Sequence, residues 1–282
     1  MDINDFEIEL ASIEEVIMTD LDDEAQYDDT NEIRISSTSS IDQLVNEAAV
    51  RNFCKNSKTI RAITLHHTYS PNASQYKGRS TILGIKKYHM QSVGASDIMA
   101  NFYTSPVDNY IGWTGRSLSV KNGAHAHISK PWNSVPSDLK TRANGNTQYL
   151  NYYSVGIETI GNLDSENPKN SKAMKNSIKL MAILCDIYKL DIEKDLYFHR
   201  DVAYKSCPGN LVTKEWVKQE VKKQMANENK PDVSSWAIEA VNWAKKEGII
   251  TGYTNGKFGG TDPVTREQLA VILKRFHDKF IK

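Results

Sequence analysis

Four side chains of types that can bind metals lie at or near the ends of short apolar segments. His66 and His67 end one such segment, His199 ends another, and Cys207 follows eight residues after His199. Imidazole nitrogen and thiolate sulfur are preferred zinc ligands, and a catalytic zinc keeps three protein ligands and one open position. Zinc lowers the pKa of its water to about 7, which makes hydroxide available at neutral pH. The pattern is compatible with a hydrolytic zinc site, although a lone cysteine is more often a small buried side chain.

The elements that would position these residues alternate between strands and helices. Short β-type segments are predicted at 62–65, 101–104, 110–113, 154–159 and 196–199, and helices at about 80–89, 171–190 and 213–225. This alternation predicts an α/β domain with a mixed central β-sheet flanked by helices. The polar stretch 129–150 shows little periodicity, so we predict a functional or mobile loop there.

The length of 282 residues suggests about two domains. We expect an acidic N-terminal extension with helical segments over 1–55, a catalytic domain over 56–226 and a C-terminal module over 232–282. The net charge is zero, which argues against a strongly basic nucleic-acid binder. Residues 1–33, however, hold 13 acidic residues and no Lys or Arg, so the remainder carries a net charge of +13. We interpret this as an acidic segment attached to a basic body.

The compartment and the partners that we expect depend on sequence patterns that we do not find. No basic stretch followed by an apolar one opens the chain, so we expect synthesis in the cytoplasm without a signal peptide. The longest apolar helical run, Leu180–Cys185, has six residues, whereas a membrane span needs about 20. Three cysteines do not make a disulfide framework. We therefore expect no membrane partner, and without a basic stripe interleaved with aromatic residues we expect no nucleic-acid partner.

Five short motifs, taken together, resemble a known family over about residues 60–225. In chain order they are Leu65-His66-His67-Thr68, Gly123-Ala124-His125, Ser154-Val155-Gly156-Ile157-Glu158, His199-Arg200-Asp201 and Cys207-Pro208-Gly209. Any one of them would be a weak signal, but five in the family's order are specific. They resemble the zinc-dependent N-acetylmuramoyl-L-alanine amidases, which include phage endolysins and share their fold with peptidoglycan recognition proteins.

The resemblance implies a role for each matching residue. The zinc ligands would be His66, His199 and Cys207. Glu158 matches the acid that serves as general base in one branch of the family, and Lys205 matches a position that stabilises the oxyanion. The residues at the positions that line the family's substrate groove are Asn101, His125 and Asn151.

The implied reaction is hydrolysis of the amide bond between N-acetylmuramic acid and L-alanine. Glu158 would take a proton from water and later deliver it to the leaving amine. Lys205 would offset the negative charge of the tetrahedral intermediate. Many members carry a catalytic Tyr where this chain has Ala100, so we do not expect the Tyr-dependent variant of the mechanism.

The C-terminal segment 232–282 predicts a small all-α helix-loop-helix module. Thr265 and Gln268 form a capping box that opens a final helix. The whole segment resembles one S-layer homology repeat, a type that binds anionic secondary cell-wall polymers. Arg266 is the residue that we expect to contact the polymer, because a guanidinium forks onto carboxylate or phosphate. The alternative for Arg266 is an ordinary exposed residue at a helix start.

A single repeat is a small unit to fold alone. We therefore expect a homo-oligomer formed through the module, or packing of the module on the catalytic domain. An internal start at Met225 would supply free modules for such an assembly.

The leading hypothesis is a phage or prophage endolysin that cleaves the peptidoglycan of a Gram-positive cell wall after holin-dependent release. A host autolysin is one alternative, and a non-catalytic peptidoglycan receptor is another. A third is a structural protein anchored to an S-layer. The third ligand position discriminates catalyst from receptor, because catalytic members keep a Cys or Asp there and this chain has Cys207.

Overall fold

The structure is a computed structural model, and it describes residues 43–44, 47–108, 110–120, 123–228, 232–253 and 258–281. The predictions for the acidic segment 1–33 lie outside the described residues.

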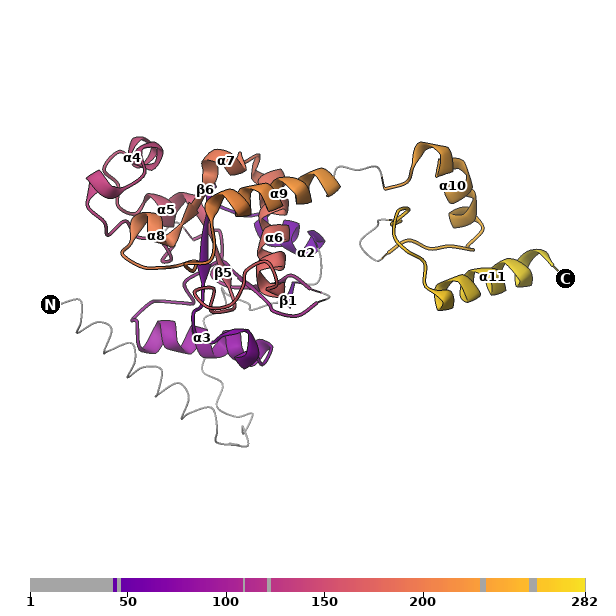
Figure 1. The fold of residues 1–282 in the computed structure, drawn as a ribbon, viewed down its shortest axis with the longest axis horizontal. Coiled ribbons are helices and arrows are strands. Elements are labelled where there is room, and N and C mark those ends of the chain that lie inside the picture. Colours follow the sequence, from indigo (N-terminus) through magenta and orange to yellow (C-terminus); the bar gives the residue numbers. More distant parts are fainter. Residues whose placement is uncertain are drawn as a thin grey trace, which may run out of the picture.

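A six-stranded mixed sheet forms the centre of the larger, N-terminal domain (Figure 1). The strands, in sheet order, are β1 (Gln43–Leu44), β4 (Gly112–Thr114), β3 (Phe102–Thr104), β5 (Ser154–Thr159), β2 (Ala62–His67) and β6 (Leu196–Phe198). Strands β3, β5, β2 and β6 run parallel, whereas β4 is antiparallel to both β3 and β1. The predicted α/β class is confirmed.

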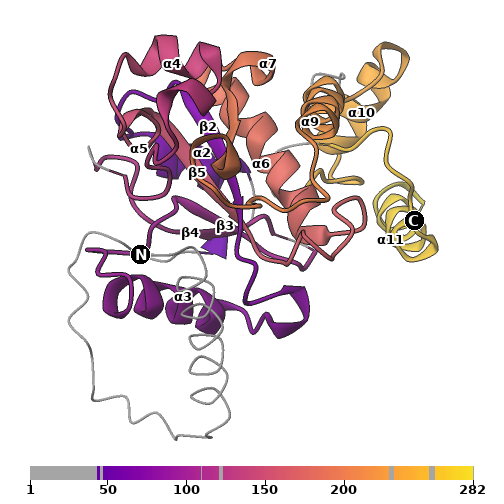
Figure 2. The same cartoon turned by 60° about the vertical axis from the view of Figure 1, so that its left-hand side comes forward.

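Helices cover both faces of this sheet (Figure 2). One face carries α2 (Glu47–Cys54), α6 (Lys172–Tyr188) and α9 (Lys214–Glu228), which share one apolar core with the strands. The other face carries α3 (Arg79–Gln91), α4 (Ser137–Ala143) and α5 (Tyr149–Tyr153). The remaining short elements are η1 (Ala73–Gln75), η2 (Trp132–Ser134), α7 (Ile192–Asp195) and α8 (His199–Val202).

Strand β2 shows how the sequence produces this arrangement. Side chains alternate across a strand, so Ile63 and Leu65 enter the core with α6 while Ala62 joins the core on the other face. All six residues of β2 are buried, as expected for a central strand of a parallel ladder. Burial of an Ile or Leu side chain contributes about 1.5–3 kcal/mol. The same alternation sends His66 to the face opposite α6.

Elements before the boundary predicted at residue 55 also contact the sheet. Strand β1 pairs with β4, and Val50 and Cys54 of α2 lie in the core beside α6. Strand β1 and helix α2 therefore pair and pack with this sheet. The apolar side chains of α2 were too few to show, in the sequence, which partner they pack against.

The predicted loop at 129–150 also differs from the structure. This segment contains η2, α4 and the start of α5, and Leu139 and Leu150 are fully buried. Helices of five to seven residues make fewer than about two turns, which is too short for a 3.6-residue repeat to become visible.

The C-terminal module consists of η3 (Ser235–Ala237), α10 (Ile238–Lys246) and α11 (Arg266–Phe280). The capping box is present. The backbone N–H of Gln268 donates to Thr265 Oγ1 at 3.1 Å, and the backbone N–H of Thr265 donates to Gln268 Oε1 at 2.9 Å. Trp243 stacks on Phe280 with ring centroids 5.9 Å apart. No helix in the described part of the chain is long and apolar enough to cross a bilayer.

Candidate active site

Three neighbouring parallel strands deliver the candidate residues to one edge of the sheet. His66 of β2 pairs with Glu158 of β5, so both side chains leave the same face at the carboxyl ends of their strands. His199 directly follows β6, the other neighbour of β2. The carboxyl ends of parallel strands are where α/β proteins place their ligands.

The three predicted metal ligands come together. His66 Nδ1 lies 3.2 Å from His199 Nδ1 and 3.7 Å from Cys207 Sγ, and the three ligand atoms all lie within 4.8 Å of one another. With bonds of about 2.05 Å to nitrogen and 2.3 Å to sulfur, a tetrahedral zinc separates two nitrogens by about 3.3 Å and nitrogen from sulfur by about 3.6 Å. The donor atoms therefore fit a zinc ion in chemistry, and the two distances from His66 match its spacing.

Burial keeps both imidazoles in the form that binds metals. It lowers the pKa of His199 to about 4, and it holds the pKa of His66 well below its usual range. Neutral imidazole is the metal-binding state. Burial also raises the pKa of the Cys207 thiol, while the positive charge of Lys205 lowers it. A bound metal ion deprotonates a coordinating thiol, so the buried thiol is compatible with the ligand role.

Arg200 holds the loop that carries Cys207. Its guanidinium donates to the carbonyl oxygens of Ser206 at 3.2 Å, Gly209 at 2.8 Å and Val212 at 2.5 Å. One planar cation thus ties together three points of a segment without regular structure.

Asp164, in the segment after β5, forms hydrogen bonds with the same loop. Its carboxylate accepts from Ser206 Oγ at 2.8 Å and from the backbone N–H of Asn210 at 2.6 Å. Arg200 and Asp164 therefore hold the loop around Cys207 from two sides. Their role in holding this loop was not visible in the sequence.

Glu158 and Lys205 are an acidic and a basic side chain beside the ligands. Burial raises the pKa of the half-buried Glu158 to about 8, and the charge of Lys205 acts against this shift. The Lys205 charge also lowers the pKa of His66 and of His199. Lys205 itself is exposed. The charge of its ammonium thus acts on Glu158 and on both histidine ligands, and its exposed position leaves it accessible to a substrate.

The two asparagines predicted in the substrate groove are buried. Asn101 donates to the carbonyl of Arg116 at 2.9 Å and accepts from Gly156 N–H at 2.8 Å. Asn151 accepts from Ala126 N–H at 2.7 Å. Both side chains thus hold backbone segments around the site, and their contact with substrate stays a prediction.

His125, the third predicted groove residue, lies behind the metal ligands. It is buried, and its Nδ1 is 3.2 Å from Nε2 of His66. Gly156 makes room for it, because a Cβ at that position would lie 2.7 Å from Cγ of the His125 ring. The glycine of the Gly-Ile-Glu motif is therefore required by packing against a histidine.

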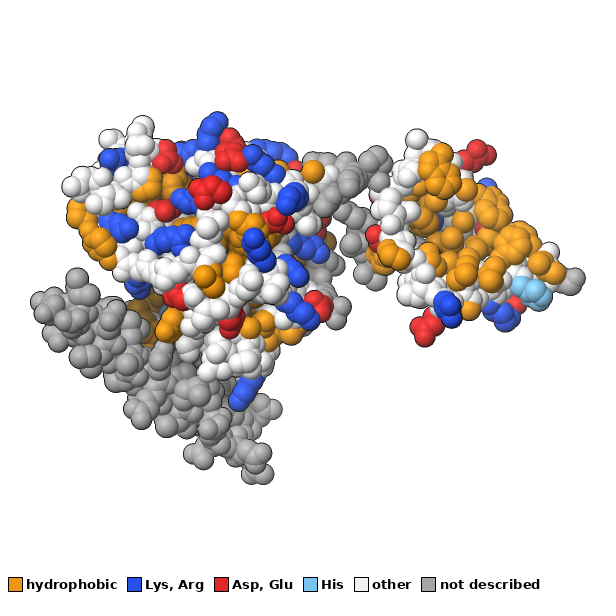
Figure 3. Space-filling view, viewed as in Figure 1, with side chains coloured by type: hydrophobic (Ala, Val, Ile, Leu, Met, Phe, Trp, Pro, Cys, Tyr) orange, Lys and Arg blue, Asp and Glu red, His pale blue; other side chains and the backbone are white. Residues whose placement is uncertain are grey.

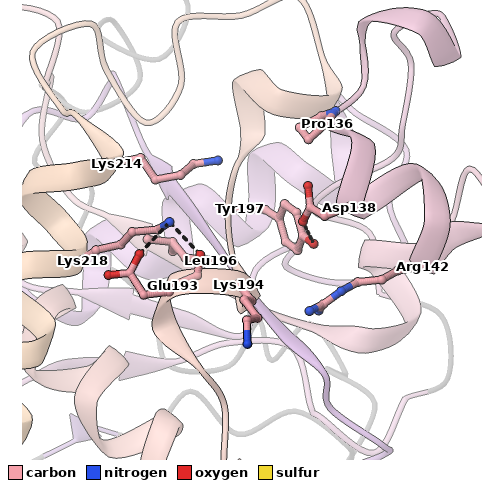
Figure 4. Close-up of a pocket in the computed structure, with 9 residues that line it drawn as sticks. All are labelled: Pro136, Asp138, Arg142, Glu193, Lys194, Leu196, Tyr197, Lys214 and Lys218. Atoms are coloured by element: carbon pink, nitrogen blue, oxygen red, sulfur yellow. Dashed lines mark hydrogen bonds and ion pairs between the residues drawn. The ribbon is translucent and has the colours of Figure 1, made fainter.

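A separate hollow of about 290 Å³ lies beside the start of β6 (Figure 4). Basic side chains that line it form ion pairs within the protein: Lys218 with Glu193 at 3.2 Å, Arg142 with Asp195 at 2.7 Å and Lys214 with Asp201 at 2.5 Å. Within the described ranges, the His66, His199 and Cys207 group alone has metal-ligand geometry. This candidate ligand group is at the opposite end of β6 from the hollow, where His199 follows the strand. The residues that line the hollow are Pro136, Asp138, Arg142, Glu193, Lys194, Leu196, Tyr197, Lys214 and Lys218.

Arg266, the predicted polymer contact, is exposed at the first position of α11. Its role in polymer binding stays a prediction.

The fold thus brings three residues of metal-ligand type, His66, His199 and Cys207, together beside the carboxyl group of Glu158. Residues 56–210, more than half of the chain, match the family model described as N-acetylmuramoyl-L-alanine amidase, and residues 231–270 match the S-layer homology domain. The chain therefore belongs to the N-acetylmuramoyl-L-alanine amidase family. The two matches support peptidoglycan hydrolysis by the catalytic domain and targeting to the cell wall by the C-terminal module.

Several solved structures are similar to the chain. Wild-type PGRP-LB of Drosophila is 24% identical with a TM-score of 0.40, and the match covers 62% of this chain and 83% of that one. The endolysin N-acetylmuramoyl-L-alanine amidase LysCS of Clostridium intestinale is 20% identical with a TM-score of 0.36, covering 66% and 90%. No curated protein matches the chain.

Proposed function

We propose that the protein is a zinc-dependent endolysin that cleaves the bond between N-acetylmuramic acid and L-alanine. The observation that carries the proposal is the meeting of His66, His199 and Cys207 beside Glu158. These three residues would hold the zinc ion. When bound, the ion supplies Lewis-acid chemistry that acidifies water and polarises an amide carbonyl.

The remaining steps fall to Glu158 and Lys205. In its ionised form Glu158 takes a proton from the attacking water, and it later delivers that proton to the nitrogen of the leaving amine as the C–N bond breaks. Lys205, exposed beside the ligands, offsets the charge that develops on the carbonyl oxygen. Asn101 and Asn151 are proposed as residues around the substrate groove.

A cell-wall assay tests this function. Purified walls incubated with the protein are expected to release new amino groups of L-alanine, and a chelator is expected to stop the release because it removes the zinc ion. Zinc added back in excess of the chelator should restore it.

The two products distinguish classes of hydrolase. New reducing sugars in place of amino groups would mean that the enzyme cleaves glycosidic bonds, and full activity after complete zinc removal would refute the zinc mechanism. Wall binding without any cleavage would favour the second candidate, a peptidoglycan receptor. Cys207 argues against that candidate, because catalytic members of the family keep a Cys or Asp at this position.

The proposed site of action is the cell wall, reached after synthesis in the cytoplasm and release through a holin-type lesion. A phage or prophage origin goes with this route, and a host autolysin is the alternative. Arg266 is proposed to bind the anionic secondary cell-wall polymer from its exposed position at the start of α11.

We also propose that the C-terminal module forms a homo-oligomer. Among its described residues the module buries only Ala244 and Ile249, and apolar side chains gather over α10 and α11 (Figure 3). Of the 17 large apolar residues that are exposed in the described parts of the chain, 11 belong to this module. The catalytic domain exposes far fewer, so a second copy of the module is the better complement.

A charge placed on this apolar surface is expected to prevent assembly. Leu273 of α11 is 59% exposed, and Leu273→Glu should convert an oligomer into a monomer of about the 31.8 kDa chain mass. Light scattering coupled to gel filtration measures this directly. The matched control is Lys274→Ala, which changes the net charge by the same amount and should leave the oligomer intact. A wild-type protein that is already monomeric at high concentration would contradict the proposal.

A further inference from the structure

The ring of His66 has a second nitrogen, which points away from the other ligands. His66 Nε2 lies 3.2 Å from Nδ1 of His125, and the two rings are nearly perpendicular at 86°. Both side chains are buried, with 3% and 5% of their surface exposed. Buried polar atoms need partners within the protein, so these two nitrogens form one hydrogen bond whose direction matters.

The hydrogen bonds beyond His125 set this direction. Ser154 Oγ donates its single hydrogen to the carbonyl of Leu150 at 2.8 Å. Its oxygen therefore accepts from its other neighbours, which are Thr64 Oγ1 at 2.8 Å and His125 Nε2 at 3.4 Å. A neutral imidazole has one donor and one acceptor nitrogen. With Nε2 of His125 as the donor, its Nδ1 is the acceptor.

The same logic then fixes the proton on His66. Because His125 Nδ1 accepts, His66 Nε2 must carry the hydrogen and donate it. The lone pair of His66 is then on Nδ1, the atom that faces His199 and Cys207. Histidines that bind metals commonly donate their other N–H to a carboxylate or a carbonyl. In this protein the acceptor is a second histidine, which is itself oriented by a serine.

We propose that His125 is a positioning residue that keeps Nδ1 of His66 unprotonated and directed at the metal. The proposal rests on the proposed zinc site and departs from the substrate-groove role expected from the family resemblance. The packing supports it. The His125 ring lies against the backbone of Gly156, where any Cβ would collide with it. The ring is therefore held in place and has little surface left for a substrate.

The test measures zinc affinity of full-length variants by competition with a chromophoric chelator. His125→Leu removes the acceptor at similar size, and zinc binding is expected to weaken by about 10–100-fold. The side-chain oxygen of Asn stands near the place of Nδ1, whereas that of Gln stands near Nε2. We therefore expect His125→Asn to stay within a few-fold of wild type and His125→Gln to resemble His125→Leu.

The Asn and Gln pair separates positioning from packing. If His125 has only a structural role, its replacement lowers the melting temperature of the zinc-free protein. In that case the Asn variant binds zinc no more tightly than the Gln variant. Equal affinities of the Asn and Gln variants, or a Leu variant as tight as wild type, would overturn the proposal. If the Leu variant does not fold, the Asn and Gln comparison decides.

His127→Leu is the matched control, because His127 is exposed and close in sequence. It should leave zinc affinity unchanged. A wild-type protein that binds no zinc would be a failure of the proposed function and not of the His125 assignment.

Discussion

Replacement of His199 by alanine is expected to weaken zinc binding by about 10²–10³-fold and to abolish wall cleavage. Binding free energies of about 10–16 kcal/mol shared among four ligands amount to about 2.5–4 kcal/mol per ligand. His199 Nδ1 is 3.2 Å from His66 Nδ1, so its loss leaves two protein ligands where three met. Zinc content after dialysis and the release of amino groups from walls are the measurements.

His277→Ala is the matched control for this variant. His277 is an exposed histidine of α11, in the C-terminal module, and its removal should change neither zinc content nor cleavage. A His199→Ala protein that keeps both stoichiometric zinc and wall cleavage would show that the ion is held elsewhere.

The strands that carry the site could be predicted because their local signals agree with their surroundings. Segments 62–65 and 154–159 are apolar, short and β-branched, and they become the buried partners β2 and β5. Residues His66 and His199 each end a predicted strand, so they could be expected at one edge of the sheet. The family resemblance was needed to favour a zinc site over packed side chains, and it alone pointed to Glu158.

The surroundings of the ligands could not be predicted in the same way. The contact between His66 and His125 joins residues 59 positions apart, and its direction depends on Ser154 and Leu150. Nothing in the sequence indicates that these residues contact one another. Only the folded sheet, with Gly156 leaving space for an imidazole ring, shows that they form one chain of hydrogen bonds.

The contacts of Arg200 with the loop around Cys207 also could not be predicted from the sequence. Arg200 lies in the His-Arg-Asp motif and could be read as a surface cation of the basic catalytic domain. In the structure it donates to three backbone carbonyls of the following loop. A charged side chain that satisfies backbone groups leaves no periodic or compositional pattern, so its role emerges only when the loop closes around it.

Replacement of Glu158 by glutamine is expected to lower the turnover number by about 10²–10⁴-fold, the usual contribution of a general base, while zinc binding stays close to wild type. Glutamine keeps the shape of the side chain but cannot accept the proton of water. Glu193→Gln, on the exposed helix α7, is the control and should retain full activity. An unchanged turnover number in Glu158→Gln would assign the base to another group.

The dependence of activity on pH adds a second, independent measurement on the same residue. Burial raises the pKa of Glu158 to about 8 and the charge of Lys205 lowers it. Only the ionised carboxylate acts as a base, so activity should rise with pH through this pKa. Lys205→Met removes the charge that favours ionisation, and the acidic limb of the profile should therefore move to higher pH. The limb should disappear in Glu158→Gln. A shift toward lower pH in Lys205→Met would contradict the placement of this lysine beside the carboxylate.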